Sequence, residues 1–195
     1  MTLLPPENAA LVQIVLWRNL PAAGSDYCAL YRLPKGWLLK GTAIAALEVK
    51  DPVLVHYEVE CDGSWCTRSV EVHCAHGTNY ACLKLQADLG VWSRDSETLD
   101  DLRGCRDIDI ALTPATNTLP IRRLGLSPGA SQEVTAAWIK IPDLTIQLLP
   151  QRYTKIDDHR YLYQSANNFS ADLEVDDEGM VIRYGTFWER LAVYG

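Results

Sequence analysis

Short stretches of the chain alternate between apolar and polar residues, which is the pattern of half-buried β-strands. Residues 53–61 are the clearest case, because Val55, Tyr57 and Val59 fall on one face and mostly polar residues on the other. Clusters of Gly, Pro, Asn, Asp and Ser separate these stretches and indicate short turns. The pattern predicts about fourteen strands, over residues 11–18, 27–33, 37–47, 53–61, 65–75, 80–87, 90–93, 106–112, 132–141, 144–153, 160–165, 169–176, 180–184 and 188–194.

One stretch has helical features. After the alternating residues 106–112, Thr113-Pro114 ends the strand, because proline has no N–H to donate to a neighbouring strand. Ile121 and Leu124 then share a face at helical spacing, and Gly125 is suited to a left-handed helix end. We therefore expect one short helix over residues 117–125, with helix-start acceptors from Thr116, Asn117 and Thr118. Short loops elsewhere favour a continuous meandering antiparallel sheet.

The turn at Asp62-Gly63-Ser64 predicts a hairpin. The alternation of apolar and polar residues fits two registers of this hairpin and cannot decide between them. A turn at Asp62-Gly63 pairs Val59 with Cys66, whereas a turn at Gly63-Ser64 pairs Cys61 with Cys66. Only the second register would bring Cys61 and Cys66 close enough for a disulfide. We expect free thiols for both residues, as for the other four cysteines, at positions 28, 74, 82 and 105.

Residues 104–126, which read GCRDIDIALTPATNTLPIRRLGL, resemble a known family. Further matching pieces are Glu60-Cys61-Asp62 followed by Trp65 and Thr67-Arg68, then Gln151-Arg152-Tyr153 and Leu173-Glu174-Val175-Asp176. Together they extend from Trp17 to Trp188 and are similar to the putative glycolipid-binding family of bacterial proteins. The resemblance implies a spiral β-roll, in which one long antiparallel sheet winds around a single short α-helix. It also implies a homodimer and a glycolipid-like ligand.

Size and charge restrict the function classes. The 195 residues fit one domain, of which residues 1–10 are expected to form a loose arm. The net charge is −7 and no basic stripe is visible, so nucleic acid is disfavoured as a partner. No stretch reaches the ~20 apolar residues of a membrane span, so no integral membrane segment is expected. An N-terminus without a convincing export signal indicates a cytoplasmic protein with reduced thiols.

Arginine positions suggest where polar chemistry could lie. Arg68 shares the face of Val70 and Val72 by alternation, so its guanidinium needs a carboxylate or anionic ligand unless it reaches outward. Arg122 and Arg123 point about 100° apart on a helix, so only one of them can face inward. That arginine is expected to meet Asp107 or Asp109 on the preceding strand.

No catalytic or metal motif stands out. His73 and His76, in the run His73-Cys74-Ala75-His76, point to opposite strand faces, and Cys82 is a weak third ligand, so we expect no metal site and no cofactor. Asp107 and Asp109 are about 7 Å apart on one strand face, within the range of paired glycosidase carboxylates. We expect that face to be exposed, where two alternating acids are common. No Gly-x-Ser-x-Gly elbow or glycine-rich phosphate loop is present.

The sequence favours one function and leaves two alternatives open. The first is a non-enzymatic protein that binds a glycolipid or another amphipathic molecule inside the curled sheet. The second is a hydrolase for a sugar or ester, and the third is a dimeric interaction scaffold in which the helix only plugs the sheet. The 6 Trp and 9 Tyr residues could line a groove or simply pack the core. For the first function we expect polar or aromatic lining from Trp65, Arg68, Asn117, Arg123, Tyr153 and Tyr163.

Overall fold

The computed structural model describes residues 7–47 and 51–195. Within these ranges the chain forms a single sheet of fifteen strands, one α-helix and two short 3-10 helices. Every predicted strand is present, and the additional strand is the two-residue β8. The loose arm expected over residues 1–10 falls partly on residues 1–6, which lie outside the described ranges. Every helix in the described ranges is too short to cross a lipid bilayer.

The strands of the first half are β1 (Ala10–Asn19), β2 (Gly24–Leu33), β3 (Gly36–Ala46), β4 (Pro52–Asp62), β5 (Thr67–His76), β6 (Asn79–Asp88), β7 (Val91–Arg94) and β8 (Glu97–Thr98). A 3-10 helix, η1 (Asp100–Leu102), leads to β9 (Asp107–Ile110). The second half contains η2 (Ala115–Asn117), α1 (Thr118–Leu124), β10 (Ser131–Ile139), β11 (Ile146–Lys155), β12 (Arg160–Ser165), β13 (Phe169–Val175), β14 (Val181–Tyr184) and β15 (Trp188–Tyr194).

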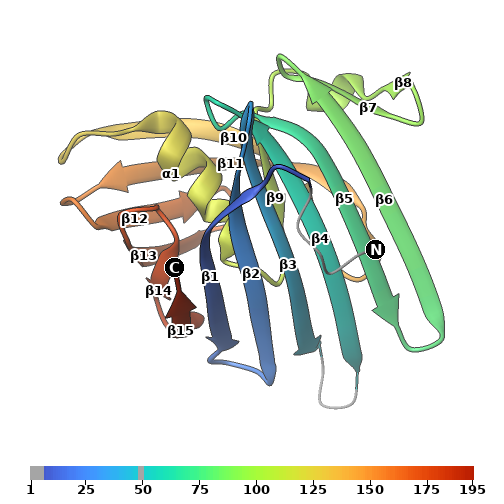
Figure 1. Cartoon of the computed structure of the whole chain (residues 1–195), viewed down its shortest axis with the longest axis horizontal. Helices are drawn as coiled ribbons and strands as arrows, with labels where there is room; N and C mark the ends of the chain where they lie inside the picture. Colours follow the sequence, from blue (N-terminus) through green and yellow to red (C-terminus); the bar gives the residue numbers. More distant parts are fainter. Residues whose placement is uncertain (1–6, 48–50) are drawn as a thin grey trace.

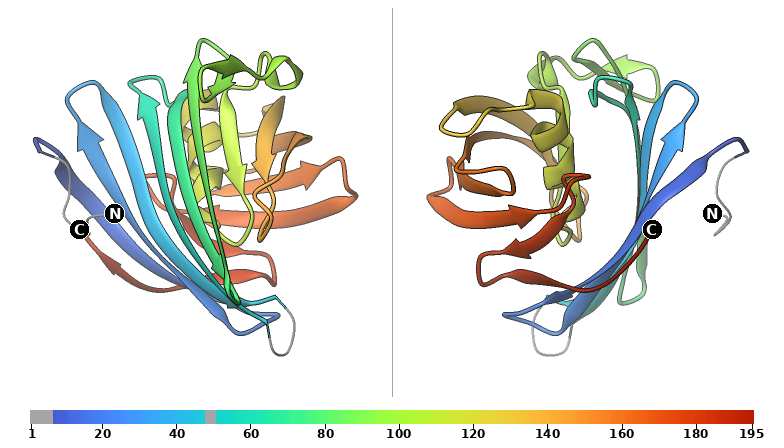
Figure 2. Two further views of the ribbon diagram at one scale, coloured as in Figure 1. Left: turned by 90° about the vertical axis from the view of Figure 1, so that its right-hand side faces the viewer. Right: turned by 60° about the vertical axis from the view of Figure 1, so that its left-hand side comes forward.

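The sheet curls around the helix. Its strand order runs from β8 back to β1, continues through β15 beside β1, and then runs back to β9. Strands β1–β6 form one long wall and β10–β15 a second, shorter wall, with α1 between them (Figures 1 and 2). The β9 end of the sheet meets the long wall where the backbone N–H of Thr67, at the start of β5, donates to the carbonyl of Arg106 at 2.9 Å. The predicted spiral β-roll is confirmed.

One pair of strands departs from the expected antiparallel sheet. Strands β9 and β10 are parallel, with Ile108 opposite Ala137. Two parallel neighbours need a long crossover connection, and η2 and α1 lie within it. The helix therefore enters the interior because it belongs to the connection that brings β10 back alongside β9.

The helix was predicted almost to the residue. Gly125 ends it with a φ of 53°, in the left-handed conformation that glycine tolerates. The expected helix-start role of Asn117 is wrong, because its side chain makes no capping hydrogen bond to the helix. Instead the Thr113 hydroxyl accepts a hydrogen bond from the N–H of Ala115 at 2.9 Å. The Asn117 side-chain amide donates instead to the carbonyl of Pro114 at 3.1 Å, so it satisfies a backbone group of the turn before the helix.

Neither predicted register of the hairpin between β4 and β5 is correct. Cys61 lies opposite Thr67 and Glu60 opposite Ser69, so Arg68 is an extra residue in a β-bulge. The Asp62 carboxylate holds the turn by accepting hydrogen bonds from the N–H groups of Ser64 and Cys66, at 2.9 and 3.0 Å. A four-residue loop replaces the expected two-residue turn, and all six cysteines are free thiols.

A buried polar cluster joins the long wall to the crossover. Asp26 is fully buried, and its Oδ2 accepts hydrogen bonds from the hydroxyls of Tyr57, at 2.9 Å, and Thr113, at 2.5 Å. The Tyr57 ring lies across Gly41, where an added Cβ would come within 2.2 Å of it. A glycine at position 41 therefore allows Tyr57 to reach across the sheet to Asp26.

Candidate functional site

Four of the six predicted lining residues meet between α1 and the second wall. Tyr153 on β11 is 1% exposed, and its hydroxyl donates to the Asn117 side-chain oxygen at 3.0 Å. Its ring lies 5.1 Å from that of Tyr163 on β12, centre to centre. Arg123, near the end of α1, donates two hydrogen bonds to the carboxylate of Asp107, at 2.9 and 2.5 Å. This ion pair confirms the expected contact between one helix arginine and β9.

The two aspartates of β9 are not on an exposed face, as the sequence led us to expect. Asp107 is 1% exposed, and Asp109 accepts a hydrogen bond from Gln151 at 2.6 Å. Burial raises the pKa of Asp109 to about 6, although hydrogen bonds from Gln151 and Thr116 favour its charged form. The parallel pairing of β9 with β10 places this strand inside the curl, which alternation alone could not reveal.

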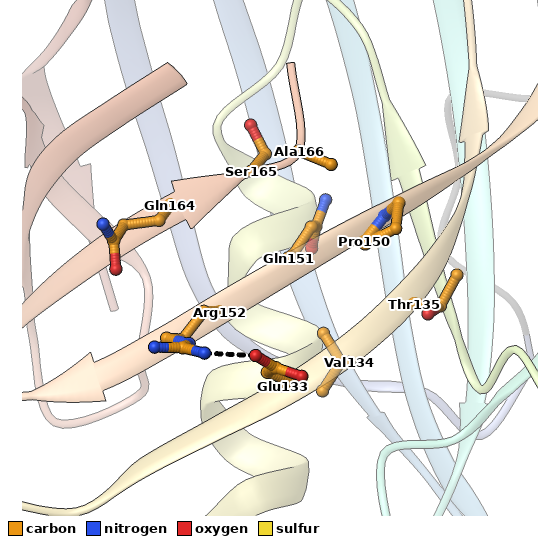
Figure 3. Close-up of a pocket in the computed structure, with 9 residues that line it drawn as sticks. All are labelled: Glu133, Val134, Thr135, Pro150, Gln151, Arg152, Gln164, Ser165 and Ala166. Atoms are coloured by element: carbon orange, nitrogen blue, oxygen red, sulfur yellow. Dashed lines mark hydrogen bonds and ion pairs between the residues drawn. The ribbon is translucent and has the colours of Figure 1, made fainter. Parts of the chain in front are cut away.

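Gln151 connects this network to a surface groove, which we call groove A. Its volume is about 450 Å³, and it crosses the outer side of β10, β11 and β12 (Figure 3). An ion pair between Arg152 and Glu133 crosses it (Figure 3). Among its lining residues Gln151 is the one that also contacts Asp109. The groove is lined by Glu133, Val134, Thr135, Pro150, Gln151, Arg152, Gln164, Ser165 and Ala166.

A second groove, groove B, adjoins it and shares residues 133–135 of β10. Its volume is also about 450 Å³, and three arginines line it: Arg103, Arg106 and Arg123. Arg103 is paired with Asp100 at 2.7 Å and Arg123 with Asp107. Within the described residues the exposed Arg106 guanidinium makes no hydrogen bond or ion pair. Groove B thus offers an unused cation in a protein of net charge −7.

Apolar side chains complete groove B. Leu124 at the end of α1, Val134 on β10 and Leu148 on β11 lie along it, and Leu148 is 48% exposed. The groove therefore joins a cationic region to an apolar wall. This combination suits a molecule that carries both an anionic group and a hydrocarbon portion.

The other two predicted residues lie elsewhere. Trp65 is buried in the β4–β5 hairpin, stacked on Trp37 at 4.4 Å, with the Arg122 guanidinium 5.3 Å from its ring centre. Arg68 does not face the interior, because the bulge turns it outward to ion pairs with Asp62, at 3.3 Å, and with Asp88. Trp65 lines a separate depression of about 440 Å³ beside Arg122 and Tyr161.

Sequence reasoning missed Arg106 and Gln151. Arg106 immediately precedes β9, and nothing in its sequence neighbourhood distinguishes it from a solvated arginine. Gln151 belongs to the motif Gln151-Arg152-Tyr153, which carried part of the family resemblance and was the available signal. Its inward orientation follows from the alternation of β11, in which Leu149, Gln151 and Tyr153 are all buried.

Comparison with known proteins identifies the family. A family model described as putative glycolipid-binding matches residues 14–190. The chain belongs to this family. Among solved structures, a DUF1089 family protein from Pseudomonas aeruginosa aligns with a TM-score of 0.78 and 37% identity, over 85% of this chain and 92% of that one.

A second solved structure is similar to this member of the glycolipid-binding family in its fold. It is a β-barrel-like protein of unknown function (DUF1849) from Brucella abortus, with a TM-score of 0.53 over 95% of this chain and 96% of that one. At 9% identity this likeness concerns the fold alone. A search of curated proteins finds no match.

Proposed function

We propose that this protein binds an amphipathic, glycolipid-like molecule without chemical conversion, and that groove B receives its anionic head group. The observation that carries the proposal is the unpaired Arg106 guanidinium beside the Arg123–Asp107 pair. Arginine suits such a site because its planar fork donates paired hydrogen bonds to phosphate, sulfate or carboxylate. Membership of the glycolipid-binding family supports the same ligand class.

Groove A would hold the sugar portion of the ligand. Its lining offers amide and hydroxyl groups from Thr135, Gln164 and Ser165, which can exchange hydrogen bonds with sugar hydroxyls. Leu124, Val134 and Leu148 would contact the start of the hydrocarbon chain. Asn117, Tyr153 and Tyr163 would then act from beneath the groove, by holding Gln151 and Asp109 in place.

A matched pair of short amphiphiles tests the proposal. Octyl glucoside and octyl glucoside 6-phosphate share the sugar and the chain and differ only in charge. We expect calorimetry, below the concentrations at which either forms micelles, to show about tenfold or greater preference for the phosphate, since a hydrogen bond to a charged group contributes about 1.5–3 kcal/mol. Native mass spectrometry and lipid extraction of freshly purified protein would identify the natural ligand.

Two variants locate the site. Arg106→Gln should remove most of the preference for the phosphate, whereas Arg94→Gln should not. Arg94 is a suitable control because it is an exposed arginine on β7, 3.7 Å from Asp95 and outside both grooves. Equal binding of both amphiphiles by the wild type would overturn the anionic preference. A preference that survives Arg106→Gln would overturn the assignment to groove B.

A further inference from the structure

Three potential metal ligands gather on the outer face of the long wall, away from both grooves. Val70, Val72 and Cys74 of β5 are buried, so the alternate residues Glu71 and His73 face outward. On β6, Cys82 lies directly opposite His73. Because the three residues come from two adjacent strands of a continuous sheet, the backbone fixes their relative positions before any ligand binds.

The ligand atoms already lie close together. One atom from each of Glu71, His73 and Cys82 lies within 4.8 Å of the other two. The His73 Nε2 is 2.6 Å from Glu71 Oε1 and 4.0 Å from Cys82 Sγ. In a tetrahedral zinc site, bond lengths of about 2.1 and 2.3 Å place nitrogen and sulfur ligands about 3.6 Å apart. The nitrogen–sulfur separation is therefore within about 0.4 Å of the coordination value, and small side-chain rotations would adjust the carboxylate.

The second nitrogen of His73 is also engaged. Its Nδ1 is hydrogen-bonded to the Tyr80 hydroxyl on β6. In metal sites, a partner on the distal nitrogen orients the imidazole and fixes the tautomer that leaves the other nitrogen free to coordinate. Without a metal, a proton on Nε2 bridges His73 to Glu71 Oε1 at 2.6 Å. When a metal displaces this proton, Nδ1 can carry a proton and donate it to the Tyr80 hydroxyl oxygen.

We propose that Glu71, His73 and Cys82 bind a divalent transition metal of the Zn²⁺ class at this outer face. A carboxylate, an imidazole and a thiolate match the borderline-soft preference of Zn²⁺ and Co²⁺, whereas Mg²⁺ and Ca²⁺ require oxygen ligands. Three protein ligands leave a coordination position for water or for a fourth side chain. His56 on β4 lies directly opposite His73.

The positive charge of Lys84 disfavours metal binding at this site, so removing it tests the proposal. Its ammonium lies 3.0 Å from Glu71 Oε1, where its charge repels an incoming cation. The Lys84 side chain is 63% exposed, so it can rotate into solvent when a metal binds. Replacing Lys84 by Gln should therefore tighten metal binding, an effect that partial unfolding of a variant could not produce.

The experiment is a Co²⁺ titration of the full, tag-free and reduced protein, followed by competition with Zn²⁺. We expect one equivalent of Co²⁺ to give visible d–d bands and a thiolate-to-cobalt charge-transfer band. His73→Ala and Cys82→Ser should each weaken binding about 100-fold or more, and Cys82→Ser should abolish the charge-transfer band.

Matched controls are available on the same strand and hairpin. His76→Gln removes a histidine that pairs with Asp51 at 2.9 Å, and Cys66→Ser removes a half-buried thiol outside the cluster. Neither should change the Co²⁺ affinity or spectrum. The proposal is overturned if wild-type protein shows no saturable charge-transfer band, or if the controls weaken binding as much as His73→Ala and Cys82→Ser.

Discussion

Asp26 is a buried carboxylate whose environment opposes its charge. It is fully buried; Oδ2 accepts two hydrogen bonds, whereas Oδ1 has no partner among the described residues. Desolvation raises the pKa of Asp26 to about 7, in spite of the hydrogen bonds from Thr113 and Tyr57. The folded protein therefore holds a proton at Asp26 that the unfolded chain releases near pH 4.

This predicts a loss of stability on raising the pH. Asp26 contributes its full stabilisation below about pH 4, and this contribution is lost as the pH rises through about 7. The shift from 3.8 to about 7 corresponds to about 4 kcal/mol. Urea unfolding between pH 4 and pH 8 should show this decline in the wild type and a flatter profile in Asp26→Asn. Asp101→Asn, at an exposed position, should keep the wild-type slope, and a pH-independent wild type would contradict the prediction.

Residue-level prediction from the sequence succeeded where the strand was regular and failed at a bulge. Arg68 was expected to point inward with Val70, but the extra residue in the ladder turned it to Asp62. The bulge depends on the Asp62 side chain bonding two backbone N–H groups, and on the positive φ of 65° at Trp65. The alternation of apolar and polar residues encodes neither feature, so the register of the β4–β5 hairpin could not be predicted from it.

At the element scale, one ion pair holds α1 against β9. The Arg123 side chain is 14% exposed and that of Asp107 only 2%, so removal of the arginine leaves a buried carboxylate without its cation. Such a loss typically destabilises by about 3–5 kcal/mol. We predict that Arg123→Met lowers the free energy of unfolding by about that amount, measured by urea denaturation.

The matching double variant separates charge burial from lost packing. Arg123→Met combined with Asp107→Asn should recover much of the stability, because no buried charge remains unpaired. Arg152→Gln breaks the exposed pair with Glu133 and should cost less than about 1 kcal/mol. If Arg123→Met proved no more destabilising than Arg152→Gln, α1 would be held by packing rather than by this pair.

The sequence was sufficient to predict which strands and helices exist and their order along the chain, but not which strands lie next to each other in every case. Alternation and turn residues located the strands, and the residues after Thr113 located α1. The parallel contact of β9 and β10 depends on how the crossover folds back, a long-range property that local periodicity does not contain. The burial of Asp107 and the formation of groove B both follow from that pairing. The candidate site was therefore predicted only as a set of residues, without its surface.

At the scale of the whole molecule, closure of the curl creates the site. The hydrogen bond from the N–H of Thr67 to the carbonyl of Arg106 fixes the backbone just before β9, at the place where this end of the sheet meets β5 of the long wall. Arg106 is thereby held at the rim of groove B, and residues 133–135 of β10 line both this groove and groove A. The ligand surface is thus a property of the closed roll, since no single strand or hairpin contains it.

The homodimer stays a prediction, and it belongs to the scale of the whole molecule. Leu191 and Val193 on β15 are 52% and 54% exposed, and Val193 pairs with the fully buried Val15 of β1. Apolar residues left uncovered where two strands meet are suited to pack against a second copy of the chain. Light scattering after size-exclusion chromatography should give twice the chain mass of 21.8 kDa. Leu191→Lys with Val193→Lys should shift the protein to monomer, whereas Leu89→Lys, at an 86% exposed position, should not. A wild type that remains monomeric at high concentration would rule out the dimer.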